Sequence, residues 1–245
     1  MIDEFNLMSG LRVLQSELKK AADNSRVSGY RQFFKTKPGQ YGFGDKFLGL
    51  SVPQQRKIAA NFYGLSLLEI KQLLNSPWHE FRLTGLIILT HQYQKADLIG
   101  QTRIARFYLD NLNRANNWDL IDLSAAKILG AYLLTIPSLA AEKLLFRLAS
   151  SNNLWERRAA IVSTYAFIKE GRSTLTFKIA KKLFNDQHDL IHKATGWMLR
   201  ETGKHCGPEI LVRFLDKQAR VMPRTTLRYA LEHFSKKDRK KYLSH

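Results

Sequence analysis

An aspartate placed among cations is the feature of this sequence that first suggests chemistry. Four pairs of small residues recur along the chain, and the residue three positions before the second member of each pair is Arg82, Asp122, Arg157 or Lys193. In a repeating helical array, equivalent positions line one face, so this pattern predicts a concave basic groove that contains one carboxylate. Two interpretations stay open: Asp122 forms a salt bridge with a neighbouring arginine, or it is an acid placed where positive charge develops during a reaction.

Tryptophans accompany this position. Trp118 precedes Asp122 by four residues, so the two side chains share one face of a helix. Trp155 and Trp197 occupy comparable places in the next two repeats. A tryptophan at helical spacing is usually part of a core, but an aromatic side chain beside a basic groove also contacts bases and deoxyribose. Spacing alone leaves both interpretations open.

The elements that must position these residues are helices. Apolar residues recur at helical spacing in several segments, for example 11–18, 104–112, 139–148 and 210–215. Ser66 and Glu69 form a capping box, Ser76-Pro77 predicts an N-cap followed by the first helical residue, and Ser235 predicts the start of the last helix. All six prolines fall at such starts or in loops, and no strand-like alternation occurs. The sequence therefore predicts an all-α protein.

The small pairs predict how the helices are arranged. Their second members are spaced 35 to 40 residues apart, and each small residue is expected mid-helix, where it lets a neighbouring helix approach closely. This period is typical of a right-handed α-solenoid of HEAT-like helical repeats. We expect one domain over residues 1–245, with N-terminal capping helices at about 1–45 and repeats at about 46–245. The pairs are Thr84-Gly85, Ser124-Ala125, Ala159-Ala160 and Thr195-Gly196.

The charge of the chain indicates its partner. Lys and Arg number 39 against 21 Asp and Glu, which gives a formal net charge of +18. Such an excess favours a polyanion, although charge alone does not separate DNA from RNA or an acidic membrane surface. The start of the chain has no basic segment typical of a signal peptide, and no apolar run approaches the roughly 20 residues that cross a bilayer. We expect a soluble cytoplasmic protein associated with the nucleoid.

Other motifs predict neither a cofactor nor a metal. The one cysteine, Cys206, allows neither an internal disulfide nor a thiolate cluster. His188 and His192 have zinc-ligand spacing but no evident third ligand. Ser124 to Lys127 spell the S-x-x-K motif of penicillin-recognising enzymes without its companion motifs.

Four segments in order make the sequence resemble the AlkD-type family of DNA alkylation-repair glycosylases, over nearly the whole chain. They are Phe47-Leu-Gly-Leu-Ser-Val-Pro53, Asn117-Trp-Asp-Leu-Ile-Asp122, Asn153-Leu-Trp-Glu-Arg-Arg-Ala-Ala160 and His192-Lys-Ala-Thr-Gly-Trp-Met-Leu-Arg-Glu201. The resemblance implies HEAT-like repeats and the excision of cationic N3- or N7-alkylated purines from duplex DNA, in base excision repair. It also implies a groove in which the lesion stays within or near the base stack.

The resemblance assigns roles to four residues. The catalytic aspartate falls on Asp122, the two lesion-side tryptophans on Trp118 and Trp197, and the phosphate-contacting arginine on Arg158. From the charge pattern we add six further DNA contacts: Arg82, Arg157, Lys193, Arg224, Thr225 and Arg228. We expect a monomer that acts on alkylated double-stranded DNA without a protein partner.

The chemistry suits this set of residues. An N3- or N7-alkylated purine is positively charged and already a good leaving group, so no general acid is needed. An ionised Asp122 stabilises the oxocarbenium-like sugar and orients the attacking water, while Trp118 and Trp197 hold the sugar and the cationic base through their π faces. The alternatives are a non-catalytic HEAT-like protein that binds DNA structures or acts as a scaffold, and an RNA-binding solenoid. A pure binder has no use for a carboxylate that faces phosphates, so Asp122 favours the enzyme.

Overall fold

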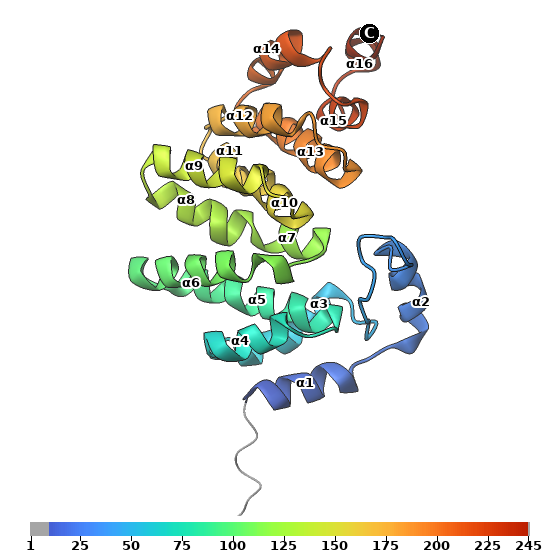
Figure 1. The fold of residues 1–245 in the computed structure, drawn as a ribbon, viewed down its shortest axis with the longest axis vertical. Helices are drawn as coiled ribbons and strands as arrows, with labels where there is room; N and C mark the ends of the chain where they lie inside the picture. Colours follow the sequence, from blue (N-terminus) through green and yellow to red (C-terminus); the bar gives the residue numbers. More distant parts are fainter. Residues whose placement is uncertain (1–9, 245) are drawn as a thin grey trace, which may run out of the picture. The chain divides into compact units, whose positions relative to one another are not determined.

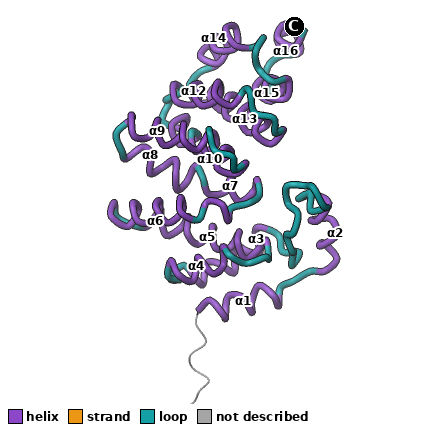
Figure 2. Tube along the Cα trace, viewed as in Figure 1, coloured by secondary structure: helices purple, strands orange, loops and turns teal. Residues whose placement is uncertain are grey.

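The computed structural model describes residues 10–244, and across that range the protein consists of helices and connecting loops. The residues on which the expected lack of a signal peptide rests, 1–5, lie outside this range. Within it, β-pairing is limited to one isolated bridge between Lys46 and Trp78. The predicted all-α class is confirmed (Figure 2). None of the described helices is both long and apolar enough for a membrane span.

The chain forms two compact units, residues 1–124 and 125–245. In unit 1, α5 is the central helix, and α3, α4, α6 and α7 each pack against it (Figure 1). The helices of unit 1 are α1 (Gly10–Lys20), α2 (Asn24–Phe33), α3 (Val52–Ala59), α4 (Leu67–Leu74), α5 (His79–Lys95), α6 (Leu98–Asp110) and α7 (Trp118–Ser124), with short 3-10 turns at Ala60–Phe62 and Leu112–Arg114.

Unit 2 stacks its helices in pairs. Helix α9 packs on α10 and α12, α10 packs on α13, and α13 packs on α12, α14 and α15 (Figure 1). Its elements are a π-helical turn (Ala126–Gly130), α8 (Ala131–Thr135), α9 (Ser138–Ala149), α10 (Leu154–Ser163), α11 (Tyr165–Lys169), α12 (Thr174–Leu183), α13 (Asp189–His205), α14 (Pro208–Gln218), α15 (Arg224–Ala230) and α16 (Lys236–Leu243). The right-handed solenoid, its concave basic groove and the single domain over 1–245 stay predictions.

Two of the three predicted helix starts are confirmed. The Ser66 hydroxyl accepts the Glu69 backbone N–H while the Glu69 carboxylate accepts the Ser66 backbone N–H, which is a capping box. Ser235 caps α16 in the same way, by accepting the Asp238 backbone N–H. The prediction from Ser76-Pro77 is wrong by two residues, because α5 starts at His79 and the Ser76 hydroxyl accepts the Trp78 N–H in the preceding turn.

The loop before α3 is organised by a buried carboxylate. Glu80, only 1% exposed, accepts the backbone N–H groups of Leu48, Gly49 and Leu50 over 2.8 to 3.3 Å. Gly49 has a φ of +86°, and a Cβ there would overlap the Asp23 carbonyl. Residues 47–51 thus form a loop, built around the Glu80 side chain, that leads into α3.

Small residues permit close helix packing in unit 2, as the repeat pattern predicts. A Cβ on Gly196, in the middle of α13, would overlap the Thr226 carbonyl oxygen and the Tyr229 Cβ of α15. Ala159 and Ala160 are completely buried in α10. The pair Ser124-Ala125 also lies within helical backbone, at the point where α7 passes through Ala125 (φ −60°, ψ −47°) into the π-helical turn.

Replacing Gly196 with alanine is expected to destabilise the protein. Gly196→Ala should lower the free energy of unfolding by about 1–3 kcal/mol, because the added methyl group meets backbone atoms of α15. The matched control is Gly29→Ala, since Gly29 lies in exposed α2 with open space around its Cα, and there the alanine should stabilise by roughly 0.5–1 kcal/mol. Urea denaturation of the two variants measures both, and equal effects would show that α13 and α15 do not pack this closely.

Candidate functional site

The four charged positions can be compared by counting from the first residue of each helix. This count aligns them differently from the count based on the small residues. Arg82 and Arg157 are the fourth residues of α5 and α10, whereas Asp122 and Lys193 are the fifth residues of α7 and α13. The pattern of small residues placed these four at one position, which is wrong by one residue for two of them.

The fourth-position side chains clamp the turn that precedes their own helix. Arg82 Nη1 donates to the Ser76 carbonyl over 2.9 Å, and Arg157 Nη1 donates to the Ser151 carbonyl over 3.0 Å. In α13 the fourth residue is His192, whose Nε2 lies 2.6 Å from the Asp186 carbonyl. The same separation of six residues in all three helices identifies these side chains as a repeated structural device.

Arg82 and Arg157 are further neutralised by aspartates. Arg82 Nη2 lies 2.7 Å from Asp45 Oδ1, and its side chain is 4% exposed. The prediction that Arg82 contacts DNA therefore needs correction, because its guanidinium is buried and committed to Asp45. Arg157 pairs with Asp186 at 2.6 Å but keeps 19% of its side chain exposed, beside an open cleft of about 500 Å³.

The fifth-position set contains the catalytic candidate. It comprises Asp122 in α7, Arg158 in α10 and Lys193 in α13. One carboxylate thus occupies a position at which the two repeats of unit 2 have cations. The sequence pattern predicted such a carboxylate among cations, but it placed Arg157 at this position where the structure has Arg158.

Asp122 and Trp118 lie one turn apart on α7, and both are half-buried. Burial raises the pKa of the Tyr108 phenol, and the nearby negative charge of Asp122 raises it further. Trp118 contacts two rings of unit 1: it stacks on Phe34, with ring centroids 5.5 Å apart, and meets Phe33 edge-on at 5.4 Å. Phe33 is 60% exposed, so an accessible aromatic surface continues beyond Trp118.

Trp197 belongs to unit 2, on α13. Its indole N–H donates to Glu201 Oε1 over 3.1 Å, one turn along the same helix, and its ring stacks near Tyr165 at 6.5 Å. Glu201 is 8% exposed and also pairs with Arg200 and His205. The orientation of Trp197 is therefore fixed by a carboxylate that is itself paired with the Arg200 guanidinium and contacted by the His205 ring.

The predicted DNA contacts of unit 2 gather at the starts of stacked helices. Arg158 is 5% exposed and donates to the Leu190 carbonyl at the start of α13 over 2.6 Å. Lys193 pairs with Asp189 at 2.8 Å, and hydrogen bonds to Lys193 and Thr225 lower the pKa of Asp189 against the effect of burial. Arg224 and Arg228 are exposed on α15. Helix starts and cations both favour phosphate, so this edge suits a nucleic-acid backbone.

The chain distributes the predicted residues over its two units. Trp118, Asp122 and Arg82 lie in unit 1, and the predicted residues from Arg157 to Arg228 lie in unit 2. That the two sets form one site stays a prediction. Phe33 and Phe34 were not predicted from the sequence, where their signal was a pair of adjacent aromatic residues at the end of a helix.

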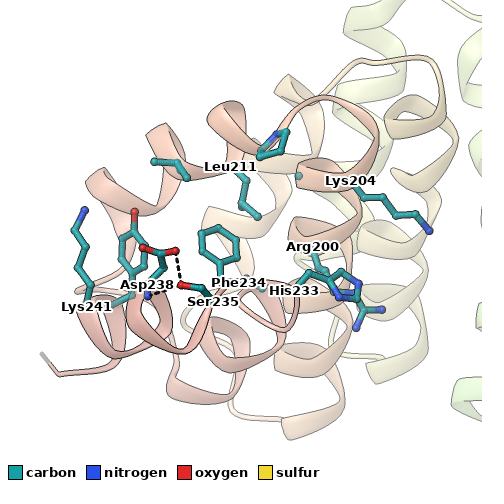
Figure 3. Close-up of a pocket in the computed structure, with 13 residues that line it drawn as sticks. Arg200, Lys204, Leu211, His233, Phe234, Ser235, Asp238 and Lys241 are labelled. Carbon is teal, nitrogen blue, oxygen red and sulfur yellow. Dashed lines mark hydrogen bonds between the residues drawn. The ribbon is translucent and has the colours of Figure 1, made fainter.

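A cavity of about 550 Å³ lies in unit 2, among α13, α14, α15 and α16 (Figure 3). Leu211 and Phe234 line its interior, while Arg200, Lys204 and Lys241 lie at its edges. Arg200, which lines this cavity, also pairs with Glu201, the carboxylate that orients Trp197. None of its lining residues belongs to the predicted site.

The fold matches solved structures of helical proteins. It is similar to a structure titled predicted DNA alkylation repair enzyme from Enterococcus faecalis, with a TM-score of 0.67, 15% identity, and coverage of 88% of this chain and 97% of that one. It is also similar to AlkD2 from Streptococcus mutans, with a TM-score of 0.50, 16% identity, and coverage of 87% and 97%. No curated protein matches the sequence.

The family follows from the sequence match. The model of the DNA alkylation repair enzyme family matches residues 14–234, most of the chain. The chain therefore belongs to the family of DNA alkylation repair enzymes.

Proposed function

We propose that this protein is a DNA glycosylase that excises cationic N3- or N7-alkylated purines from duplex DNA. The observation that carries the proposal is the half-buried carboxylate of Asp122, one turn after an aromatic side chain, at a helix position that the repeats of unit 2 give to cations. Family membership supplies the context of DNA alkylation repair.

The proposed reaction is a hydrolysis. The bond between C1′ and the purine nitrogen breaks, and its electron pair leaves with the base, which neutralises the positive charge of the alkylated ring. The sugar becomes oxocarbenium-like, and the negative charge of Asp122 stabilises it. Water adds to C1′ and loses a proton, which Asp122 accepts. The products are the neutral alkylated base and an abasic site.

Aromatic and cationic side chains bind the substrate in this proposal. Trp118 and Trp197 present π faces to the deoxyribose and the cationic base, an attraction worth about 0.5–2 kcal/mol for each ring. Phe33 extends the aromatic surface next to Trp118. Lys193, Arg224 and Arg228, with Thr225 and the exposed edge of Arg157, contact phosphates. Arg158, the phosphate-contacting arginine that the family resemblance implies, reaches a phosphate with the 5% of its surface that is exposed. Such a surface is compatible with a lesion that stays in or near the base stack.

The test is the release of free base from DNA. Purified protein is incubated with a duplex that contains 7-methylguanine or 3-methyladenine, and released base is quantified against the spontaneous rate. Release well above that rate is expected from the methylated duplex, and none from an unmodified one. Tight duplex binding without release would reject the glycosylase and leave a DNA-binding protein with an idle carboxylate. Preference for single-stranded RNA would reject DNA as the partner.

A further inference from the structure

A buried histidine connects two segments of unit 1 next to Trp118. His79, the first residue of α5, is 2% exposed. Its Nδ1 lies 3.1 Å from Asp45 Oδ2, in the loop before α3, and its Nε2 lies 2.8 Å from Asp119 Oδ2, in α7. A neutral imidazole carries one N–H and can donate to one of these carboxylates only. Two carboxylate partners therefore require the imidazolium form.

The charges around His79 balance only in that form. Asp45 and Asp119 supply two negative charges, and His79 and Arg82 supply two positive ones. The remaining carboxylate of the first turn of α5, Glu80, is committed to backbone N–H groups. Burial alone would lower the pKa of His79, but the charge of Asp119 and hydrogen bonds to both aspartates raise it to about 9 from its ordinary 6.5. Loss of the proton leaves a lone pair facing a buried carboxylate.

Trp118 is linked to this network in two ways. Asp119 is its neighbour in the chain, and Asp119 Oδ1 has no hydrogen-bond partner within residues 10–244, so the bond from Oδ2 to His79 holds this side chain. The His79 ring also contacts Phe34 at 4.6 Å, and Phe34 stacks on Trp118 with planes 25° apart. A change at His79 is thus transmitted to Trp118 through the backbone of α7 and through the aromatic stack.

We propose that the His79 imidazolium, held between Asp45 and Asp119, is a positioning group that sets the orientation of Trp118 for contact with the lesion. The inference rests on the proposed glycosylase function, since it assigns Trp118 to that reaction. It makes base release depend on a proton that lies away from the reacting atoms. His79 does not touch the substrate in this scheme, so substrate affinity should change less than the single-turnover rate.

The experiment follows Trp118 and catalysis over the same pH range. Protein labelled with 5-fluorotryptophan gives fluorine resonances, of which that of Trp118 is assigned by its loss in Trp118→Phe. From pH 7 to 10, the Trp118 resonance should shift with a midpoint near 9, and the single-turnover rate of base release, corrected for spontaneous release, should fall with the same midpoint. Asp119→Asn removes one charge from the network and should move both midpoints down by at least one pH unit. Asp110→Asn removes an exposed charge from α6 and should leave both unchanged.

Stability gives a second measurement. A group whose pKa is higher in the folded state than in the unfolded state stabilises the fold. This stabilisation is complete below the unfolded-state pKa, and it is lost as the pH rises through the folded-state pKa. The melting temperature of the wild type should therefore exceed that of His79→Gln most below pH 6.5, and the difference should shrink as pH passes 9. A Trp118 resonance that does not titrate, or midpoints unchanged in Asp119→Asn, would overturn the proposal. If the wild type releases no base, the proposed function fails, while the resonance still tests the positioning.

Discussion

Asp122→Asn should abolish most base release while DNA binding persists. The amide keeps the shape of the side chain but removes the negative charge, so the oxocarbenium-like sugar loses its stabilisation and water loses its proton acceptor. Loss of one preorganised electrostatic group costs roughly 10²–10³-fold in rate. Because a carboxylate repels phosphates, the variant should bind duplex DNA at least as tightly as the wild type. Single-turnover release and a binding titration on the same methylated duplex measure the two effects.

The control separates the role of Asp122 from a change in net charge. Asp110→Asn makes the same substitution at an exposed residue of unit 1 and should release base at the wild-type rate. Asp110→Asn should unfold at nearly the wild-type urea concentration, and urea denaturation of Asp122→Asn shows whether its rate was measured on folded protein. An Asp122→Asn protein that keeps its rate within about threefold would remove Asp122 from the mechanism, since the effect expected of such a charge is far larger.

Glu80→Gln should be among the most destabilising conservative substitutions in the chain. The buried carboxylate accepts three backbone N–H groups, of Leu48, Gly49 and Leu50. A glutamine offers one acceptor oxygen, and its NH₂ group faces an N–H donor. Each buried donor left without a partner costs about 1–3 kcal/mol, so we expect a loss of about 3–5 kcal/mol in the free energy of unfolding.

Urea denaturation compares this variant with Glu170→Gln, which changes an exposed glutamate after α11 and should be nearly neutral. The loop that Glu80 holds also carries Phe47, which stacks on Phe34 at 5.3 Å. Glu80→Gln should therefore also disturb the aromatic stack beneath Trp118, visible as a changed fluorine resonance of Trp118 under native conditions. A stability within 1 kcal/mol of the wild type would mean that the loop at 47–51 forms without the carboxylate.

The sequence alone was sufficient for most of the helices and for one close approach between two of them. Helix periodicity and capping are local signals, so the elements over 11–18, 139–148 and 210–215 and the caps at Ser66 and Ser235 were readable from neighbouring residues. Gly196 in α13 marked a close helix approach, because a Cβ at this position would overlap atoms of α15. The spacing of Trp118 and Asp122 on one face of α7 was equally local.

The tertiary structure decided which charges are available. Arg82 looked like a groove cation, but Asp45, far from it in the sequence, buries and neutralises it. The pattern of small residues could not show that Arg82 and Arg157 clamp a preceding turn, because that depends on where each helix begins. The helix start predicted at Ser76-Pro77 was wrong for the same reason. Trp78, just before α5, pairs with Lys46, which is distant in the sequence, and α5 begins at His79.

The surroundings of Trp118 were also decided by the tertiary structure. Phe33 ends α2, Phe34 follows it, and His79 begins α5, so their contacts with α7 join segments separated by 40 to 85 residues. Such contacts arise from packing and buried charge balance, which have no period in the sequence. Local residue types therefore determined that α7 presents a carboxylate and an indole together, and long-range packing determined what surrounds that indole.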